Sequence, residues 1–106
     1  MTFADNLRQL PPVDHLAALE LLDGQGRVVA TIENRPGQAG SLAVYAALWA
    51  RHGRIDAAAA REGLALFAEH TDSARQHPGQ HPNIDRLLML VEAGGSLDAQ
   101  PVPAGA

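Results

Sequence analysis

The segment from Ser41 to Gln76 constrains the fold most, because it predicts two helices joined by a tight turn. The residues that recur at helical steps of three and four in its first half are Leu42, Tyr45, Leu48, Trp49 and His52. Gly53 follows them, at a position where many helices end in the left-handed conformation. Asp56 can cap a second helix, which the run of alanines after it favours. The segment therefore predicts an αα-hairpin that turns at residues 53–55.

The two helices of this hairpin also have predicted ends. Ser41 is the expected N-cap of the first helix. The second helix is expected to run unbroken from Asp56 and to stop at or before His77, because Pro78 disfavours a helical residue ahead of it. Gly63 lies inside the second helix, where glycine costs about 1 kcal/mol relative to alanine, so a close packing contact is expected there.

A β-hairpin is predicted ahead of the helices. Its strands are His15–Leu22 and Arg27–Glu33, and the turn between them contains Gly24 and Gly26, which accept the positive φ of tight hairpins. The residues predicted to face the core are Ala17, Leu19 and Leu21 in the first strand, and Val28, Ala30 and Ile32 in the second. Glu20 is expected to face water on the other side of the sheet.

Two further helices are predicted near the ends of the chain. Thr2 and Asp5 match a capping box, which predicts a short helix over Phe3–Leu10. A longer helix is predicted over His81–Ala93, with Pro82 in its first turn. The buried stripe expected on this helix is Ile84, Leu87, Leu88 and Val91.

A third strand is predicted over Ser96–Val102. Pro101 and Pro103 lack an amide donor, so this strand should lie at the edge of the sheet or stop early, and residues 103–106 should fray. The predicted fold class is therefore α+β: a β-hairpin and a C-terminal strand form a small antiparallel sheet, which packs against the αα-hairpin, a further helix and a short N-terminal helix.

Composition excludes several classes of function. A chain of 106 residues predicts one domain, residues 1–106. The absence of cysteine excludes disulfides, and the lack of a signal peptide or a long apolar run predicts a cytoplasmic protein without a membrane contact. The net charge of −4 and the eight scattered arginines argue against nucleic-acid binding, which depends on clustered cations. No cofactor motif is present.

Three histidines and a carboxylate lie close together in the sequence. His70, His77, His81 and Asp85 could hold a zinc ion and leave one position for water. Their spacing matches no established zinc pattern. In the alternative interpretation, His77 and His81 are turn residues, and Pro82 with Asp85 begins a helix.

A glycine-containing loop between the second strand and the first long helix is the other candidate site. Arg35, Gly37, Gly40 and Ser41 could hold a phosphate or a carboxylate, because the amides that begin a helix are free to donate. No lysine follows the last glycine, so the loop is not a nucleotide P-loop. The alternative is an ordinary turn followed by an N-cap.

No set of residues indicates nucleophilic or acid–base catalysis, and the sequence therefore leans against an enzyme. The first hypothesis is a non-catalytic module that binds a protein partner or self-associates as a homodimer. The alternative hypothesis is a small-molecule, anion or metal site in the Arg35–Ser41 loop or at the His70, His77 and His81 region.

Three stretches together resemble a bacterial family of unknown function, number 2322. They are Leu42–Tyr45, Ile55 through His70, and His81–Asp85. The resemblance implies a compact α+β domain over nearly the whole chain. It implies no activity, cofactor or catalytic residue, and therefore supports the fold without deciding the function.

Overall fold

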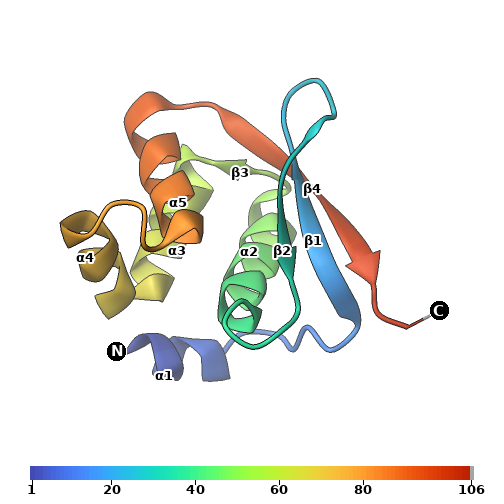
Figure 1. Cartoon of the computed structure of the whole chain (residues 1–106), viewed down its shortest axis with the longest axis horizontal. Helices are drawn as coiled ribbons and strands as arrows, with labels where there is room; N and C mark the ends of the chain where they lie inside the picture. The colour runs from blue at the N-terminus through green and yellow to red at the C-terminus, as the bar shows by residue number, and fades with distance from the viewer. Residues whose placement is uncertain (106) are drawn as a thin grey trace.

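Within residues 1–105, which the computed structural model describes, five helices lie to one side of a four-stranded antiparallel sheet (Figure 1). The predicted α+β fold class is confirmed. The helices are α1 Phe3–Arg8, α2 Ala39–His52, α3 Ala57–Phe67, α4 Glu69–Gln76 and α5 Pro82–Ala93. The strands are β1 Leu16–Leu22, β2 Val28–Glu33, β3 Ile55–Asp56 and β4 Ser96–Pro103.

The predicted joint between α2 and α3 is confirmed, but it contains a strand. Gly53 ends α2 with a φ of 75°, and the Asp56 carboxylate accepts a hydrogen bond from the Ala59 amide at 2.9 Å. Ile55 is fully buried, and residues 55–56 pair with Leu97 and Ser96 at the start of β4. The expectation of a plain turn and a three-stranded sheet was therefore wrong, because two residues are too few to show a strand periodicity.

The expected single helix from Asp56 to Gln76 was also wrong, since Ala68 divides it into α3 and α4. Ala68 has a φ of 52° and a ψ of −118°, a conformation that residues other than glycine rarely adopt. The break leaves the Leu64 carbonyl without its helical partner, and the buried Thr71 hydroxyl donates to it at 2.6 Å. This bond stabilises the break, which alanine, a strong helix former, does not signal.

Ala68→Gly is expected to raise the free energy of unfolding by about 1 kcal/mol. Relief of the strain at Ala68 should stabilise the folded protein by about 1–3 kcal/mol. Glycine also has more conformational freedom in the unfolded chain, which offsets about 0.4–1 kcal/mol of this stabilisation. Urea unfolding of both proteins measures the difference. Ala65→Gly, at an exposed position within α3, is the matched control and should lower the free energy by about 0.5–1 kcal/mol. A loss of stability in Ala68→Gly would contradict the strain.

The strand order is β2-β1-β4-β3, so β4 lies inside the sheet and not at its edge as expected. The short β3 reaches only Leu97 and Ser96, and the proline half of β4 has β1 as its single neighbour strand. This explains how an interior strand accommodates Pro101. Pro103, which was expected to fray, ends β4, and the Ala104 amide donates to the His15 carbonyl at 2.8 Å. Ala106 lies outside the described residues.

Two register shifts change the predicted faces of the hairpin. Leu19, Leu21 and Ile32 are buried as expected. A shift between Leu16 and Ala18 relative to β4 instead exposes Ala17 and buries Ala18. A second shift between Leu21 and Leu22 leaves an extra residue in β2, and Val28, predicted to face the core, is 50% exposed. Periodicity alone does not reveal such shifts, because one extra residue reverses every later side chain.

The helices close over a core centred on α2. Leu48 and Leu87 have no exposed surface, and Gly63 of α3 lies between them. A Cβ on Gly63 would lie 2.7 Å from Leu87 Cδ1 and 2.8 Å from Leu48 Cδ1, which confirms the expected close contact. The capping box of Thr2 and Asp5 is also confirmed, although α1 ends at Arg8 and not at Leu10.

Candidate functional site

A pocket of about 420 Å³ lies where α1, the β2–α2 loop, the α3–α4 joint and the start of α5 meet. Its apolar wall contains Phe3, Leu7, Phe67 and Ile84. The polar residues of its lining include Ser41, His70, Gln80, His81 and Asn83, and Gly37 and Gly40 also line it. The two sites that the sequence offered as alternatives, the glycine loop and the histidine region, therefore contribute to one pocket.

Three of the sequence-predicted residues lie outside this pocket. The exposed Arg35 guanidinium is 3.5 Å from the Glu33 carboxylate. His77 is exposed at the end of α4, and the Asp85 carboxylate accepts a hydrogen bond from the Gly79 amide at 2.9 Å. Within residues 1–105, no group of three histidine, aspartate or glutamate side chains is close enough to hold a metal ion.

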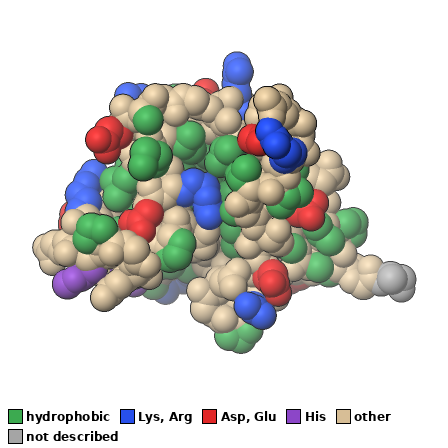
Figure 2. All heavy atoms as spheres, turned by 45° about the horizontal axis from the view of Figure 1, so that its top comes forward, with side chains coloured by type: hydrophobic (Ala, Val, Ile, Leu, Met, Phe, Trp, Pro, Cys, Tyr) green, Lys and Arg blue, Asp and Glu red, His purple; other side chains and the backbone are tan. Residues whose placement is uncertain are grey.

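The two imidazoles of the pocket lie side by side. The ring centroids of His70 and His81 are 6.1 Å apart. Figure 2 shows histidine side chains at the lower left of the face that it draws. His81 Nε2 is 3.1 Å from the Ser73 hydroxyl, which both donates and accepts and can therefore serve either protonation state of the ring. The His70 ring meets the Phe3 ring edge-on at 5.0 Å. These contacts fix both rings at the pocket wall.

A partly buried polar network holds the start of α5 beside the imidazoles. The Tyr45 hydroxyl donates to the Asn83 carbonyl at 2.5 Å, and Arg86 Nη1 donates to Asn83 Oδ1 at 2.9 Å and to the Tyr45 hydroxyl at 3.1 Å. Burial raises the pKa of Tyr45 to about 12 despite the opposing effect of the Arg86 charge. Sequence analysis missed Asn83 and Arg86, because Tyr45 is 38 positions away from Asn83 and only the fold brings them together.

The first turns of α2 and α5 both border the pocket. The prediction that Ser41 caps α2 was wrong: α2 begins at Ala39, Gln38 occupies the cap position without a side-chain bond, and Ser41 lies in the first turn. Residues 1–105 provide no acceptor for the amides of Gly40, Ser41 or Asn83. The amides that begin a helix carry partial positive charge, so the first turns of α2 and α5 both contribute positive charge to the pocket.

Among residues 1–105, no carboxylate lines the pocket, although the chain has 12 acidic residues against eight arginines. Glu69, next to His70 in sequence, uses its carboxylate to accept a hydrogen bond from the Phe3 amide at 2.8 Å. This bond holds the pKa of Glu69 below its usual range. The pocket thus combines imidazoles and free amides with an apolar wall, an arrangement that suits the binding of an anion.

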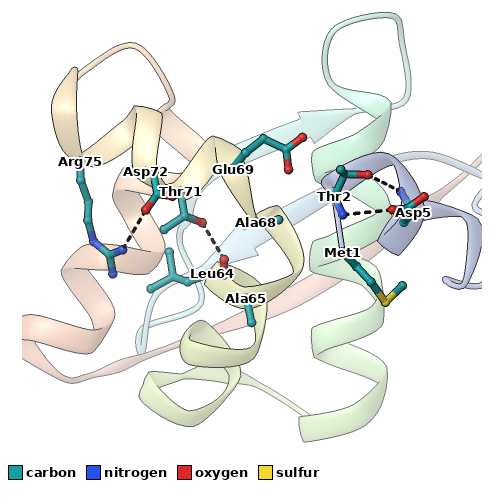
Figure 3. Close-up of a pocket in the computed structure, with 10 residues that line it drawn as sticks. All are labelled: Met1, Thr2, Asp5, Leu64, Ala65, Ala68, Glu69, Thr71, Asp72 and Arg75. Atoms are coloured by element: carbon teal, nitrogen blue, oxygen red, sulfur yellow. Dashed lines mark hydrogen bonds and ion pairs between the residues drawn. The ribbon is translucent and has the colours of Figure 1, made fainter.

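A larger hollow between α1 and the α3–α4 joint offers less chemistry. It is more open, with a volume of about 870 Å³, and Figure 3 shows Asp5, Glu69 and Asp72 around it. Each carboxylate already has a partner. Asp5 accepts from the Thr2 amide at 3.2 Å, Glu69 accepts from the Phe3 amide, and Asp72 is 3.9 Å from Arg75 Nη1. These pairs account for its charged groups without a ligand.

A family described as "uncharacterized protein conserved in bacteria", DUF2322, matches residues 3–101. The chain belongs to this family. The DUF2322 match confirms the resemblance seen in the sequence. It includes every residue that lines the pocket with His70 and His81. No curated protein and no solved structure matches the chain. Among the helices of residues 1–105, none has the length and apolar character needed to cross a membrane.

Proposed function

We propose that this DUF2322 protein binds a small anionic molecule in the pocket between α1, α2 and α5. One observation carries the proposal: two imidazoles and the glycine loop line a single pocket, to which residues 1–105 contribute no carboxylate. Protein interaction was the first hypothesis from the sequence. The convergence of the two candidate sites favours the anion-binding alternative for this part of the molecule.

The arrangement suggests how such a ligand would be held. Its anionic group would accept hydrogen bonds from the free amides of Gly40, Ser41 and Asn83. An imidazolium at His70 or His81 would add a charge-assisted bond, which is roughly twice as strong as a neutral one. Apolar atoms of the ligand would lie against the wall that Phe3 and its neighbours form. A pocket of about 420 Å³ lies within the size range of small-molecule sites.

The pocket imidazoles are expected to raise anion affinity, because each ring can donate a hydrogen bond to an anionic group. One charge-assisted bond contributes about 1.5 kcal/mol or more, which corresponds to about a tenfold change in Kd. Titration of the protein with phenyl phosphate and with inorganic phosphate at one fixed pH, followed by amide NMR, measures this affinity. The amide signals of Gly40, Ser41 and Asn83 are expected to shift.

Two variants test whether the pocket histidines contribute to this affinity. His70→Gln/His81→Gln keeps polar side chains at both positions but removes the imidazole rings, and should weaken binding by about tenfold or more. His77→Gln is the matched control, because His77 is exposed and outside the pocket lining. The proposal fails if the three amide signals stay unchanged, or if the double variant binds as tightly as the wild type. A larger effect of phenyl phosphate would indicate use of the apolar wall.

A thermal melting assay with zinc tests the metal hypothesis from the sequence. Micromolar zinc should raise the melting temperature if His70, His77, His81 and Asp85 bind it, and His77→Ala should abolish that rise. An unchanged melting temperature would exclude the hypothesis and leave the anion proposal unaffected.

A further inference from the structure

β2 is an exposed edge strand with apolar side chains. It lies at one end of the strand order, with β1 as its single neighbour strand (Figure 1). Val28 is 50% and Val29 is 52% exposed. They are two of the four large apolar side chains that residues 1–105 leave exposed. An edge strand of this kind can pair with another strand unless something blocks it.

The backbone of β2 has an open edge at its centre. The Asn34 amide donates to the Ala17 carbonyl at 2.8 Å, and hydrogen-bonded pairs alternate along an antiparallel ladder. By this alternation, the N–H and C=O of Thr31 point away from β1. The Glu33 amide, two residues on, also points outward and donates to Gln38 Oε1 at 3.0 Å. That bond confirms the alternation and closes the ladder beyond Thr31.

We propose that a second copy of this chain pairs antiparallel with β2, with the two-fold axis at Ala30. The strand and the residue before it read Arg-Val-Val-Ala-Thr-Ile-Glu from position 27 to position 33. The cross-strand pairs in this register are Arg27 with Glu33, Val28 with Ile32, and Val29 with Thr31 of the second copy. Opposite charges and β-branched pairs are both favourable across a sheet. The sequence of β2 is thus complementary to itself, as a two-fold interface requires.

The charged residues favour this register over the two neighbouring registers. An axis at Thr31 would place Arg27 opposite Arg35, and an axis at Val29 would leave both ion pairs unmade. The existing partners of these charges are weak competitors: Arg27 Nε is 3.6 Å from Asp23, and Glu33 is 3.5 Å from Arg35, each on the exposed surface. The shift between β1 and β2 leaves Val29 unpaired with β1, and Thr31 of the second copy would cover it.

Charge reversal tests the register directly. The full chain should sediment as a dimer across a concentration series. Arg27→Glu alone and Glu33→Arg alone each place like charges opposite one another, and each should weaken dimerisation by about tenfold or more. An equimolar mixture of the two variants should form a heterodimer, because every reversed charge then meets an opposite one. The double variant Arg27→Glu/Glu33→Arg should dimerise like the wild type.

Arg61→Glu, an exposed reversal on α3, is the control and should leave the dimer unchanged. Melting curves establish that each variant folds. A wild type that stays monomeric at every concentration would overturn the proposal, as would a dimer that survives both single reversals or a mixture that fails to restore it. These outcomes do not depend on anion binding, because the pocket lining includes no residue of β2.

Discussion

Leu48→Ala is expected to lower the free energy of unfolding by about 3–4 kcal/mol. Leu48 has no exposed surface and lies on α2, facing Gly63 of α3. Truncation removes buried apolar atoms and leaves a cavity that the surrounding helices fill only in part, and such changes cost about 2–5 kcal/mol. In a domain of this size, whose total stability is about 5–15 kcal/mol, the loss would be a large fraction of the whole. Urea unfolding measures this loss, provided that the free energy of unfolding depends on urea concentration with the same slope in both proteins.

The neighbouring glycine makes the prediction more specific. A Cβ on Gly63 would lie 2.8 Å from Leu48 Cδ1, so Gly63→Ala alone forces two buried leucines apart. Overpacking costs about 1–3 kcal/mol, and the better helix propensity of alanine offsets about 1 kcal/mol of that cost. When Leu48 is also truncated, the clash with Leu48 disappears, while the 2.7 Å contact with Leu87 Cδ1 remains, and the new methyl group fills part of the cavity. The double variant should therefore be more stable than the sum of the two changes by about 1–2 kcal/mol.

Met89→Ala serves as the control for this cycle. Met89 is 61% exposed on α5, and its truncation should change stability by less than about 0.5 kcal/mol. Additive behaviour of Leu48→Ala and Gly63→Ala within that margin would show that the two positions do not share a packing contact. A loss below about 1 kcal/mol in Leu48→Ala would place Leu48 outside the core.

Local signals explain why the centre of the fold was predictable from the sequence. Gly53 and Asp56 mark the end of one helix and the start of the next through their own backbone and side-chain chemistry. Gly63 was conspicuous because glycine is costly within a helix, and its reason is the contact with Leu48 and Leu87. Each of these inferences needed only the residue and its close neighbours in sequence.

The errors lie where tertiary contacts override local preference. Ala68 favours helix, yet the fold places it at positive φ and closes the break with Thr71. Residues 55–56 form a strand only because β4 lies beside them. The prolines of β4 suggested a sheet edge, but a strand as short as β3 leaves their half of β4 unpaired on one side. Sequence spacing contains no information about these partners.

The candidate site was half predictable for the same reason. Glycines at a helix start and histidines at a proline-rich turn are visible as residue types, and the sequence named both regions. That Gly40 and His81, 41 positions apart, line the same pocket follows only from the packing of α1, α2 and α5. The network of Tyr45, Asn83 and Arg86 behind the pocket had no local signal at all.

The network of Tyr45, Asn83 and Arg86 makes the stability of the protein sensitive to alkaline pH. The free energy of unfolding should fall by about 2–3 kcal/mol between pH 10 and pH 12. The chain has one tyrosine, no cysteine and, since all eight of its basic residues are arginine, no lysine. Arginine stays charged throughout this range. Tyr45 is therefore the one side chain that titrates there, and alkaline unfolding reports on a single group.

The sign follows from the raised pKa of Tyr45. Burial raises it from 10.0 to about 12 in the folded protein. Above pH 10 the unfolded chain loses the tyrosine proton while the folded chain keeps it, so the unfolded state binds fewer protons and stability falls as the pH rises. Below pH 10 the protonated Tyr45 side chain makes its full contribution to the free energy of unfolding, and above about pH 12 this contribution is lost. A difference of two pKa units corresponds to about 2.7 kcal/mol.

Tyr45→Phe separates this titration from other alkaline effects. At pH 7 the variant should be less stable by about 2 kcal/mol, because the Asn83 carbonyl loses its donor and Arg86 loses an acceptor in a buried setting. Between pH 10 and pH 12, however, its stability should stay level while that of the wild type falls, so the two curves should meet near pH 12. Urea unfolding across this range, with tyrosinate absorbance as the probe of ionisation, measures both. An equal alkaline loss in Tyr45→Phe would show that ionisation of Tyr45 does not cause the loss.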